Sequence, residues 1–179
     1  LAASERGGSP RNFFDWRPVL RENEAGFFPY TPATLTLFGL RAALDMLFEE
    51  GLQKVFARHR RLAGAVRAAV GAWGLDVYCA DVDACSDTLT GVVVPEGLDS
   101  ADVIRRARER FGLALGVGLG KLKGKLFRIG HLGWLNELEV LAVIAGVEMT
   151  LVEGGVRVRV GSGVEAAEEA LLAREPVAR

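Results

Sequence analysis

The sequence of 179 residues predicts an α+β fold, in which helices cover one face of a small, mostly antiparallel sheet behind a long helix. Two observations lead to this prediction. Apolar residues recur at helical spacing over residues 35–73, and after them short β-branched segments alternate with helical ones in the order β-α-β-β-α. The expected strands lie at 75–79, 88–95, 113–117 and 126–131, and the expected helices of this second part lie at 99–111 and 136–149.

The composition is that of an ordinary globular protein. Half of the residues are hydrophobic and 25% are charged, which supports a sizeable core and argues against disorder. A net charge of −1 argues against a nucleic-acid or anionic-membrane partner. No apolar run approaches the ~20 residues that span a bilayer. Since the sequence also shows no signal-peptide pattern, we expect a cytoplasmic protein.

The first elements follow from proline and glycine positions. A short helix is expected up to Glu24, ended by Gly26, with an extended segment at 27–32 because each proline keeps its predecessor out of the helical region. Thr31 and Pro32 suit the N-cap and first position of the long helix. Gly51 is expected to break or kink that helix, which gives either one very long helix or two in tandem.

The second part carries clear capping signals. Asp99 is expected to cap the helix at 99–111, and Asn136 with Glu139 has the spacing of a capping box. A short edge strand at 156–160 and a terminal helix at 165–174 complete the prediction. The inward face of the 136–149 helix is expected to hold five residues: Leu138, Leu141, Ala142, Ala145 and Met149.

Arg128 is the first candidate for a binding residue, because it interrupts an apolar strand. A buried guanidinium requires a partner, and arginine can grip a carboxylate through two parallel hydrogen bonds. The residues alone leave three alternatives open: a substrate carboxylate, an internal acidic partner, or an exposed sheet face.

Tyr30 and Thr31 are the second candidate. Hydroxyl groups beside the exposed N–H groups of a helix N-terminus suit an anion such as phosphate. The alternative is that Thr31 only caps its own helix. The run 116–121 lacks the spacing of a phosphate-binding loop and is expected to connect two strands. His59 and His131 are too few for a metal site and are expected to have core or capping roles.

Nine segments together resemble the C-terminal part of serine–glyoxylate and alanine–glyoxylate aminotransferases, which are class V, fold-type I enzymes that use pyridoxal 5'-phosphate. The segments occur in the same order and spacing and span nearly the whole chain. They are FFDW at 13–16, FPYTPAT at 28–34, GLRAALDM at 39–46, EEGL at 49–52, VFARH at 55–59, GVGLG at 116–120, GKLFRIGHLG at 124–133, NEL at 136–138 and AGVEM at 145–149.

The resemblance implies specific roles. Arg128 matches the arginine that binds the substrate carboxylate, and Thr31 matches a threonine that contacts the cofactor phosphate across a homodimer interface, with Tyr30 beside it. Phe28 stands where some relatives have a phosphate-binding tyrosine. The implied substrates are amino acids and 2-oxo acids, with serine or alanine as donor and glyoxylate as acceptor.

The resemblance also implies a division of the chain. Residues 1–34 would be the end of the large, cofactor-binding domain and a dimer-contact segment, 35–73 the interdomain helix or helix pair, and 74–179 the C-terminal small domain. The Schiff-base lysine of the family lies in the large domain, and none of Lys54, Lys121, Lys123 and Lys125 matches its motif. We therefore expect a C-terminal portion that contains no catalytic residue and is inactive alone.

Two non-enzymatic hypotheses stay open beside the aminotransferase. The chain could be a catalytically inactive, truncated domain that binds a partner. It could also be a free-standing sensor of small molecules, in which case the isolated chain would bind an amino acid.

Overall fold

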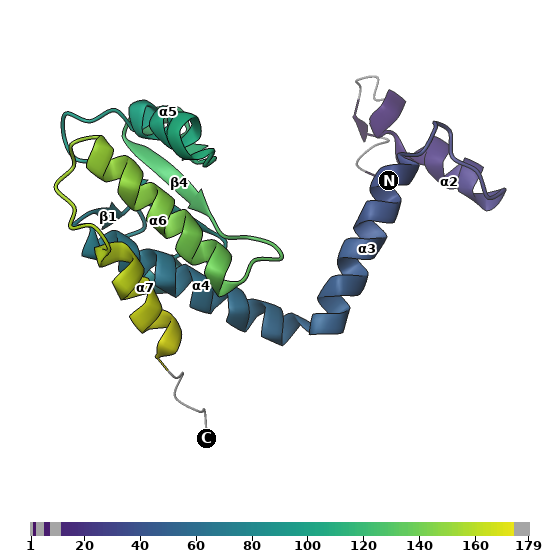
Figure 1. Ribbon diagram of the computed structural model, residues 1–179. Coiled ribbons are helices and arrows are strands. Elements are labelled where there is room, and N and C mark those ends of the chain that lie inside the picture. The colour runs from purple at the N-terminus through teal and green to yellow at the C-terminus, as the bar shows by residue number, and fades with distance from the viewer. Residues whose placement is uncertain (1, 3–5, 8–11, 174–179) are drawn as a thin grey trace. The chain divides into compact units, whose positions relative to one another are not determined.

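The computed structural model describes residues 2, 6–7 and 12–173, and it divides into two compact units, 1–49 and 50–179 (Figure 1). The remaining residues, which belong to the ends of the predicted 1–34 and 74–179 segments, lie outside the described part. They include Arg174, the last residue of the predicted terminal helix.

The first unit consists of helical elements that bury very little. Its elements are η1 (Asn12–Phe14), α2 (Trp16–Glu24) and α3 (Thr34–Glu50). The carboxylate of Asp15 caps α2 by accepting the backbone N–H of Arg17. Neither α2 nor α3 contains a buried residue, although α3 is rich in leucine and phenylalanine.

The start of α3 differs from the prediction. The helix begins at Thr34, and the first helical carbonyl is that of Ala33, which accepts the N–H of Leu37 at 3.0 Å. The N–H of Thr34 bonds the carbonyl of Pro32 at 2.8 Å, and this tight turn keeps Pro32 outside the helix. Thr31 is therefore not an N-cap.

The second unit holds a four-stranded sheet with its helices. The strand order is β1-β2-β4-β3, and all neighbouring pairs are antiparallel. The elements are α4 (Leu52–Ala72), β1 (Asp76–Val77), η2 (Val82–Ala84), β2 (Leu89–Val93), α5 (Ser100–Phe111), β3 (Gly116–Val117), η3 (Gly120–Leu122), β4 (Leu126–Gly130), α6 (Glu137–Glu153) and α7 (Ser162–Leu172). The predicted class, with helices and a small antiparallel sheet, is confirmed, and the β-α-β-β-α order runs from β2 to α6.

Gly51 separates the two helices that the periodicity left unresolved. Its φ of 87° lies in the left-handed region, which glycine adopts without steric cost, and it forms the N-cap of α4.

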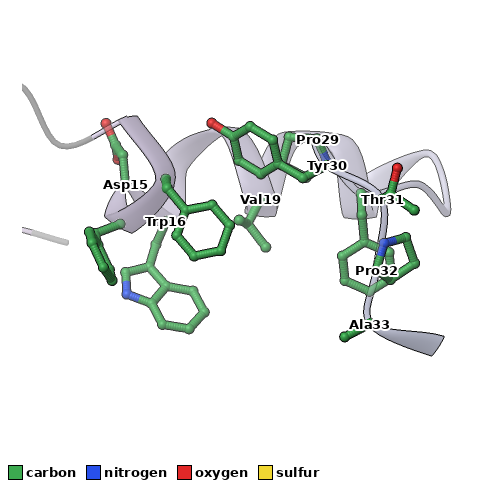
Figure 2. Close-up of a pocket in the computed structure, with 11 residues that line it drawn as sticks. Asp15, Trp16, Val19, Pro29, Tyr30, Thr31, Pro32 and Ala33 are labelled. Atoms are coloured by element: carbon green, nitrogen blue, oxygen red, sulfur yellow. The ribbon is translucent and has the colours of Figure 1, made fainter. Parts of the chain in front are cut away.

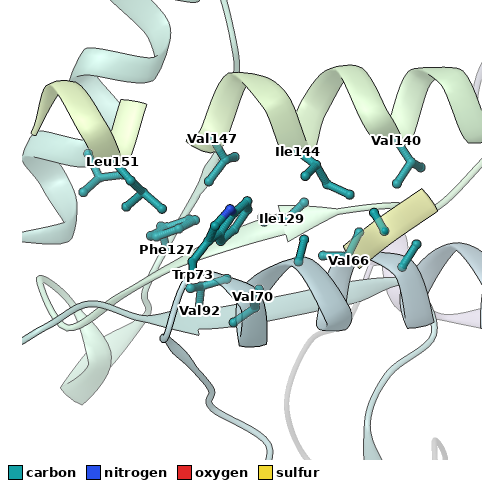
Figure 3. Packing of buried hydrophobic residues seen from close by; sticks show 14 of the residues in the cluster. Val66, Val70, Trp73, Val92, Phe127, Ile129, Val140, Ile144, Val147 and Leu151 are labelled. Carbon is teal, nitrogen blue, oxygen red and sulfur yellow. The ribbon is translucent and has the colours of Figure 1, made fainter. Parts of the chain in front are cut away.

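One hydrophobic core joins the four helices of the second unit to one face of the sheet. Figure 3 shows side chains of α6 pointing toward those of α4 and β4, with Trp73 and Phe127 between them. Burial of each large apolar side chain contributes roughly 1.5–3 kcal/mol. Representative core residues are Val66, Val70, Trp73, Val92, Val103, Phe127, Ile129, Val140, Ile144, Val147, Leu151 and Ala167.

The predicted inward face of α6 is wrong for most of its residues, although Leu141 does pack against the core. Leu138 is 76% exposed and Met149 is 44% exposed, whereas the core-facing row is Val140, Ile144, Val147 and Leu151. Because α6 is apolar around most of its circumference, its sequence pattern does not select one face. The contact with the sheet decides which row is buried.

The predicted edge strand at 156–160 is absent from the structure. The backbone there bonds locally: the N–H of Val158 donates to Val156 at 2.9 Å, and that of Ser162 donates to Arg159 at 3.0 Å. These turns use the groups that a strand would offer to a neighbour. The segment is therefore a connection between α6 and α7.

A buried carboxylate links three elements of the core. Glu148 of α6 is 3% exposed and accepts the indole N–H of Trp73 at 3.0 Å and the backbone N–H of Gly163 at 2.6 Å. It also accepts the N–H of Gly161, the N-cap of α7. A negative group at a helix N-terminus is favourable, so Glu148 fixes where α7 begins.

Both histidines have structural roles. The Nδ1–H of His59 donates to the carbonyl of Val55 at 2.8 Å, and its Nε2 accepts the N–H of Gly133 at 3.1 Å. His131 is 1% exposed; its Nδ1 bonds the carbonyl of Asp87 and its Nε2 bonds the hydroxyl of Thr90. A carbonyl only accepts, so each ring carries a proton on Nδ1, and the Nε2 of His59, which accepts an N–H, carries none. Burial lowers the pKa of His131.

Glu148→Gln is expected to lower the free energy of unfolding by about 2 kcal/mol, because charge-assisted hydrogen bonds to three donors are weakened. Urea unfolding followed by circular dichroism measures the change. The control is Glu168→Gln on α7, whose side chain is exposed. Equal losses in the two variants would contradict the role given to Glu148.

The stability of the protein is expected to fall below about pH 6.5 because of His131. The pKa is lowered in the folded state, so the unfolded chain binds a proton first as the pH drops. This contribution is complete above the ordinary pKa of 6.5 and is lost progressively below it. In His131→Asn, the slope of unfolding free energy against pH between 5 and 6.5 should be smaller than in the wild type. Identical slopes would show that His131 does not titrate in this way.

Candidate functional site

Arg128 lies at the centre of β4, on the sheet face opposite the helices. Its neighbours in sequence, Phe127 and Ile129, point into the core, and side chains alternate along a strand. The strand register places Gly91 of β2 on one side of Arg128 and Gly116 of β3 on the other. The guanidinium is thus flanked by two residues without side chains.

Within the described residues, the guanidinium of Arg128 has no acidic partner. No hydrogen bond or ion pair joins it to this part of the chain, and its Nε is sealed from solvent without an acceptor. A buried donor left unpaired costs about 1–3 kcal/mol. Of the three alternatives for Arg128, the internal acidic partner is therefore not found among the described residues.

Arg58 shows how this chain satisfies an arginine that has a structural role. Its Nε and Nη2 donate to the two carboxylate oxygens of Glu50 at 2.7 and 2.8 Å, and its Nη1 donates to the carbonyl of Gly133 at 2.8 Å. The bidentate bond with Arg58 holds the pKa of Glu50 below its ordinary value. Arg128 lacks such contacts and retains its capacity to bind a planar anion.

The sequence did not relate the two flanking glycines to Arg128. Gly91 interrupts a run of β-branched residues in β2, and a glycine inside a strand often marks a close approach of another group. That signal was available for Gly91. For Gly116 it was hidden in a glycine-rich run, and only the register of β3 with β4 shows its relation to Arg128.

Tyr30 and Thr31 line a hollow of about 400 Å³ in the first unit, between the start of α2 and the segment before α3 (Figure 2). The ring of Tyr30 lies 5.4 Å from that of Phe13, centroid to centroid. Thr31 is exposed, and no hydrogen bond of its hydroxyl occurs within the described part. The lining is mostly apolar and consists of Phe13, Phe14, Asp15, Trp16, Val19, Phe28, Pro29, Tyr30, Thr31, Pro32 and Ala33.

The residues that line this hollow provide only part of what a phosphate-binding site needs. The hydroxyl groups of Tyr30 and Thr31 can donate to phosphate oxygens. However, the described part of the lining includes the carboxylate of Asp15, which is paired with Arg17, and no lysine or arginine, and a phosphate group carries up to two negative charges. The described residues can therefore add one or two contacts to a phosphate group, but they do not balance its charge.

The run 116–121 begins with β3 itself and continues into the connection that leads to β4, so only its second part is the predicted connection between strands. It comprises β3, a two-residue connection and the start of η3. A Cβ at Gly118 would lie 2.2 Å from the carbonyl oxygen of Leu122, so the backbone of this connection is close-packed. The run therefore has a packing role here.

Two further findings concern the described residues alone. They contain no group of three or more potential metal ligands placed around one point. None of their helices has the length and apolarity needed to cross a bilayer.

Curated relatives match almost the whole chain. It is 50% identical to a serine–glyoxylate aminotransferase of Methylorubrum extorquens over 185 aligned residues, and this alignment covers 100% of the chain and 46% of that protein. It is 49% identical to a serine–glyoxylate aminotransferase of Arabidopsis thaliana, over 93% of the chain and 42% of the relative. An L-aspartate–glyoxylate aminotransferase of Paracoccus denitrificans is 42% identical over 94% of the chain. The chain thus spans less than half the length of these relatives. No family model matches it.

Solved structures share the fold. A ureidoglycine–glyoxylate aminotransferase from Bacillus subtilis aligns with a TM-score of 0.81 at 30% identity, over 94% of this chain and 44% of the other. A pyridoxamine–pyruvate aminotransferase from Mesorhizobium loti aligns with a TM-score of 0.77 at 36% identity, over 81% and 37%. An alanine–glyoxylate aminotransferase from Nostoc sp. aligns with a TM-score of 0.74 at 26% identity, over 82% and 40%.

Proposed function

We propose, because the chain resembles the C-terminal portions of class V aminotransferases of the serine–glyoxylate and alanine–glyoxylate type, that it is the corresponding portion of such an enzyme. The reaction would transfer an amino group from serine or alanine to glyoxylate, in the cytoplasm. The observation that carries the proposal is the guanidinium of Arg128, which has no partner among the described residues and lies on the sheet face opposite the helices.

Arg128 would bind the carboxylate that both substrates share. Amino acids and 2-oxo acids carry a carboxylate beside the reacting carbon, and a guanidinium holds such a group in a fixed plane through two hydrogen bonds. Binding at this end orients the α-carbon in the same way for donor and acceptor. Arg128 would therefore position both substrates without taking part in proton transfer.

Thr31, with Tyr30 beside it, would contact the phosphate of pyridoxal 5'-phosphate bound by a partner subunit of a homodimer. The enzymes that the chain resembles use this cofactor, which stabilises negative charge at the substrate α-carbon when bound. The partial fit of the hollow supports a supplementary role: Thr31 is exposed, and the described part of the lining supplies no cationic group.

The base that moves the substrate proton would be a lysine outside this chain. All four lysines of the chain are exposed: Lys54, Lys121, Lys123 and Lys125. A lysine that acts as a base near neutral pH needs burial or a cationic neighbour to lower its pKa. Their exposure supports the proposal that the chain is inactive by itself.

A second candidate function is a catalytically inactive domain that binds a protein partner. It is favoured by the exposed apolar side chains of α3, which bury nothing within the described residues. Leu35 is 88% exposed and Phe38 is 68% exposed. Large exposed apolar patches mark surfaces that another chain or domain covers.

The two candidates predict different native species. For the aminotransferase, the protein isolated from its source should have a subunit mass of about twice 19.2 kDa, because the chain matches 46% of its relative. It should also absorb near 420 nm, as expected for pyridoxal 5'-phosphate joined to a lysine. Intact-mass spectrometry with an absorbance scan tests both. A subunit of 19.2 kDa without the band would support the binding domain.

In the complete enzyme, Arg128→Lys is expected to lower kcat/KM for the amino-acid donor about 100-fold, because lysine cannot form the bidentate bond. The dissociation constant of the cofactor should stay within about twofold. Steady-state kinetics and cofactor titration measure the two quantities. Thr31→Val is the matched control, with weaker cofactor binding and an unchanged KM. Equal loss of both functions in Arg128→Lys would count against a substrate role.

A further inference from the structure

The side chain of Arg128 lies over the bare backbone of Gly116. A Cβ at Gly116 would lie 3.1 Å from the Cβ of Arg128, 3.1 Å from its Nε and 3.4 Å from its Nη2. The first two distances are shorter than ordinary van der Waals contacts. A methyl group at this position would therefore push against the guanidinium itself.

The other flanking glycine does not have this relation. A Cβ at Gly91 would lie 3.5 Å from the Cβ of Tyr78 and 3.9 Å from Cδ2 of Leu126, both ordinary contacts, and Arg128 is not among its three nearest groups. The arginine thus bends toward β3 and away from β2. Only the residue opposite it on β3 has to lack a side chain.

The backbone does not explain the glycine at position 116. Gly116 is not among the residues with positive φ, so any amino acid could adopt its conformation. A glycine within a strand weakens the strand, since it loses more conformational freedom and packs nothing. The glycine at position 116 is therefore explained by the space above it, which holds the Arg128 side chain and which a larger residue would fill.

The enclosed Nε indicates which edge of the guanidinium meets a ligand. Nε has no solvent contact and no acceptor within the described residues. A carboxylate could not reach it without displacing the side chain. The two terminal nitrogens, Nη1 and Nη2, are the donors left for a ligand.

We propose that Gly116 is a positioning residue for Arg128: its missing side chain lets the guanidinium lie along β3 and present its two terminal nitrogens to a substrate carboxylate. The inference rests on the proposed function and adds to it a determinant of specificity. A side chain at position 116 would turn the guanidinium and reduce the preference for substrates with a carboxylate.

Gly116→Ala in the complete, cofactor-loaded enzyme is expected to raise KM for alanine at least tenfold, with kcat changed less than threefold. Cofactor affinity should be unchanged. The ratio of kcat/KM for alanine to that for ethylamine, which lacks the carboxylate, should fall at least tenfold. Gly91→Ala is the matched control and should change the ratio less than threefold. A purely structural effect would lower kcat/KM for alanine and for ethylamine by the same factor, and this result would overturn the inference.

A double-mutant cycle with Arg128→Gln separates this inference from the proposed function. If Gly116 acts through Arg128, Gly116→Ala should add less than twofold to KM in the Arg128→Gln background. If Arg128→Gln raises KM but Gly116→Ala does not, the inference fails alone. If Arg128→Gln leaves KM unchanged, the carboxylate role of Arg128 fails, and the inference with it.

Folding of the variants is checked by circular dichroism. If Gly116→Ala fails to fold because the added methyl group clashes with the guanidinium of Arg128, the double variant with Arg128→Gln should fold. A double variant that also fails to fold would assign Gly116 to the backbone packing of β3 and would overturn the inference.

Discussion

The register of β4 between β2 and β3 is the constraint on which the second unit depends. Because side chains alternate along a strand, the same register buries Phe127 and Ile129 and turns Arg128 to the opposite face. A slip by one residue would place a guanidinium in the core and expose an aromatic ring. The hydrophobic core therefore fixes the direction of the candidate binding residue, and the two flanking glycines then decide how its side chain lies.

Buried polar groups specify how the helices meet this sheet. The carboxylate of Glu148 joins α6, the end of α4 and the start of α7, and His131 ties β4 to the loop before β2. Each group has its hydrogen bonds satisfied by the chain itself, which makes burial tolerable. Arg128 is different, since its enclosed Nε lacks an acceptor among the described residues. Nη1 of Arg106 on α5 and Oγ of Ser162 at the start of α7 are also buried without a partner among the described residues. Arg128 differs from them in its place, on the sheet face opposite the helices, and a buried donor without a partner there is a candidate binding group.

The first unit has a different physical character. Its helices bury no residue, and the hollow beside Tyr30 and Thr31 is lined mostly by apolar side chains. Such a unit gains little stability from its own packing, because apolar burial supplies most of the favourable free energy of folding. Tyr30 and Thr31 would therefore form part of a site together with another domain or subunit that packs over this unit. This agrees with a chain that spans less than half the length of its relatives.

The sequence by itself determined the order of the elements, the capping box at Asn136 and the interruption of an apolar strand by Arg128, because capping and periodicity are local properties of the chain. It placed the start of α3 too early and assigned the wrong face to α6, since tight turns and the choice of face depend on contacts. Only the tertiary structure decided that Arg128 has no acidic partner among the described residues and lies over Gly116. These two residues are joined by strand register, a long-range relation that their spacing in the sequence does not show.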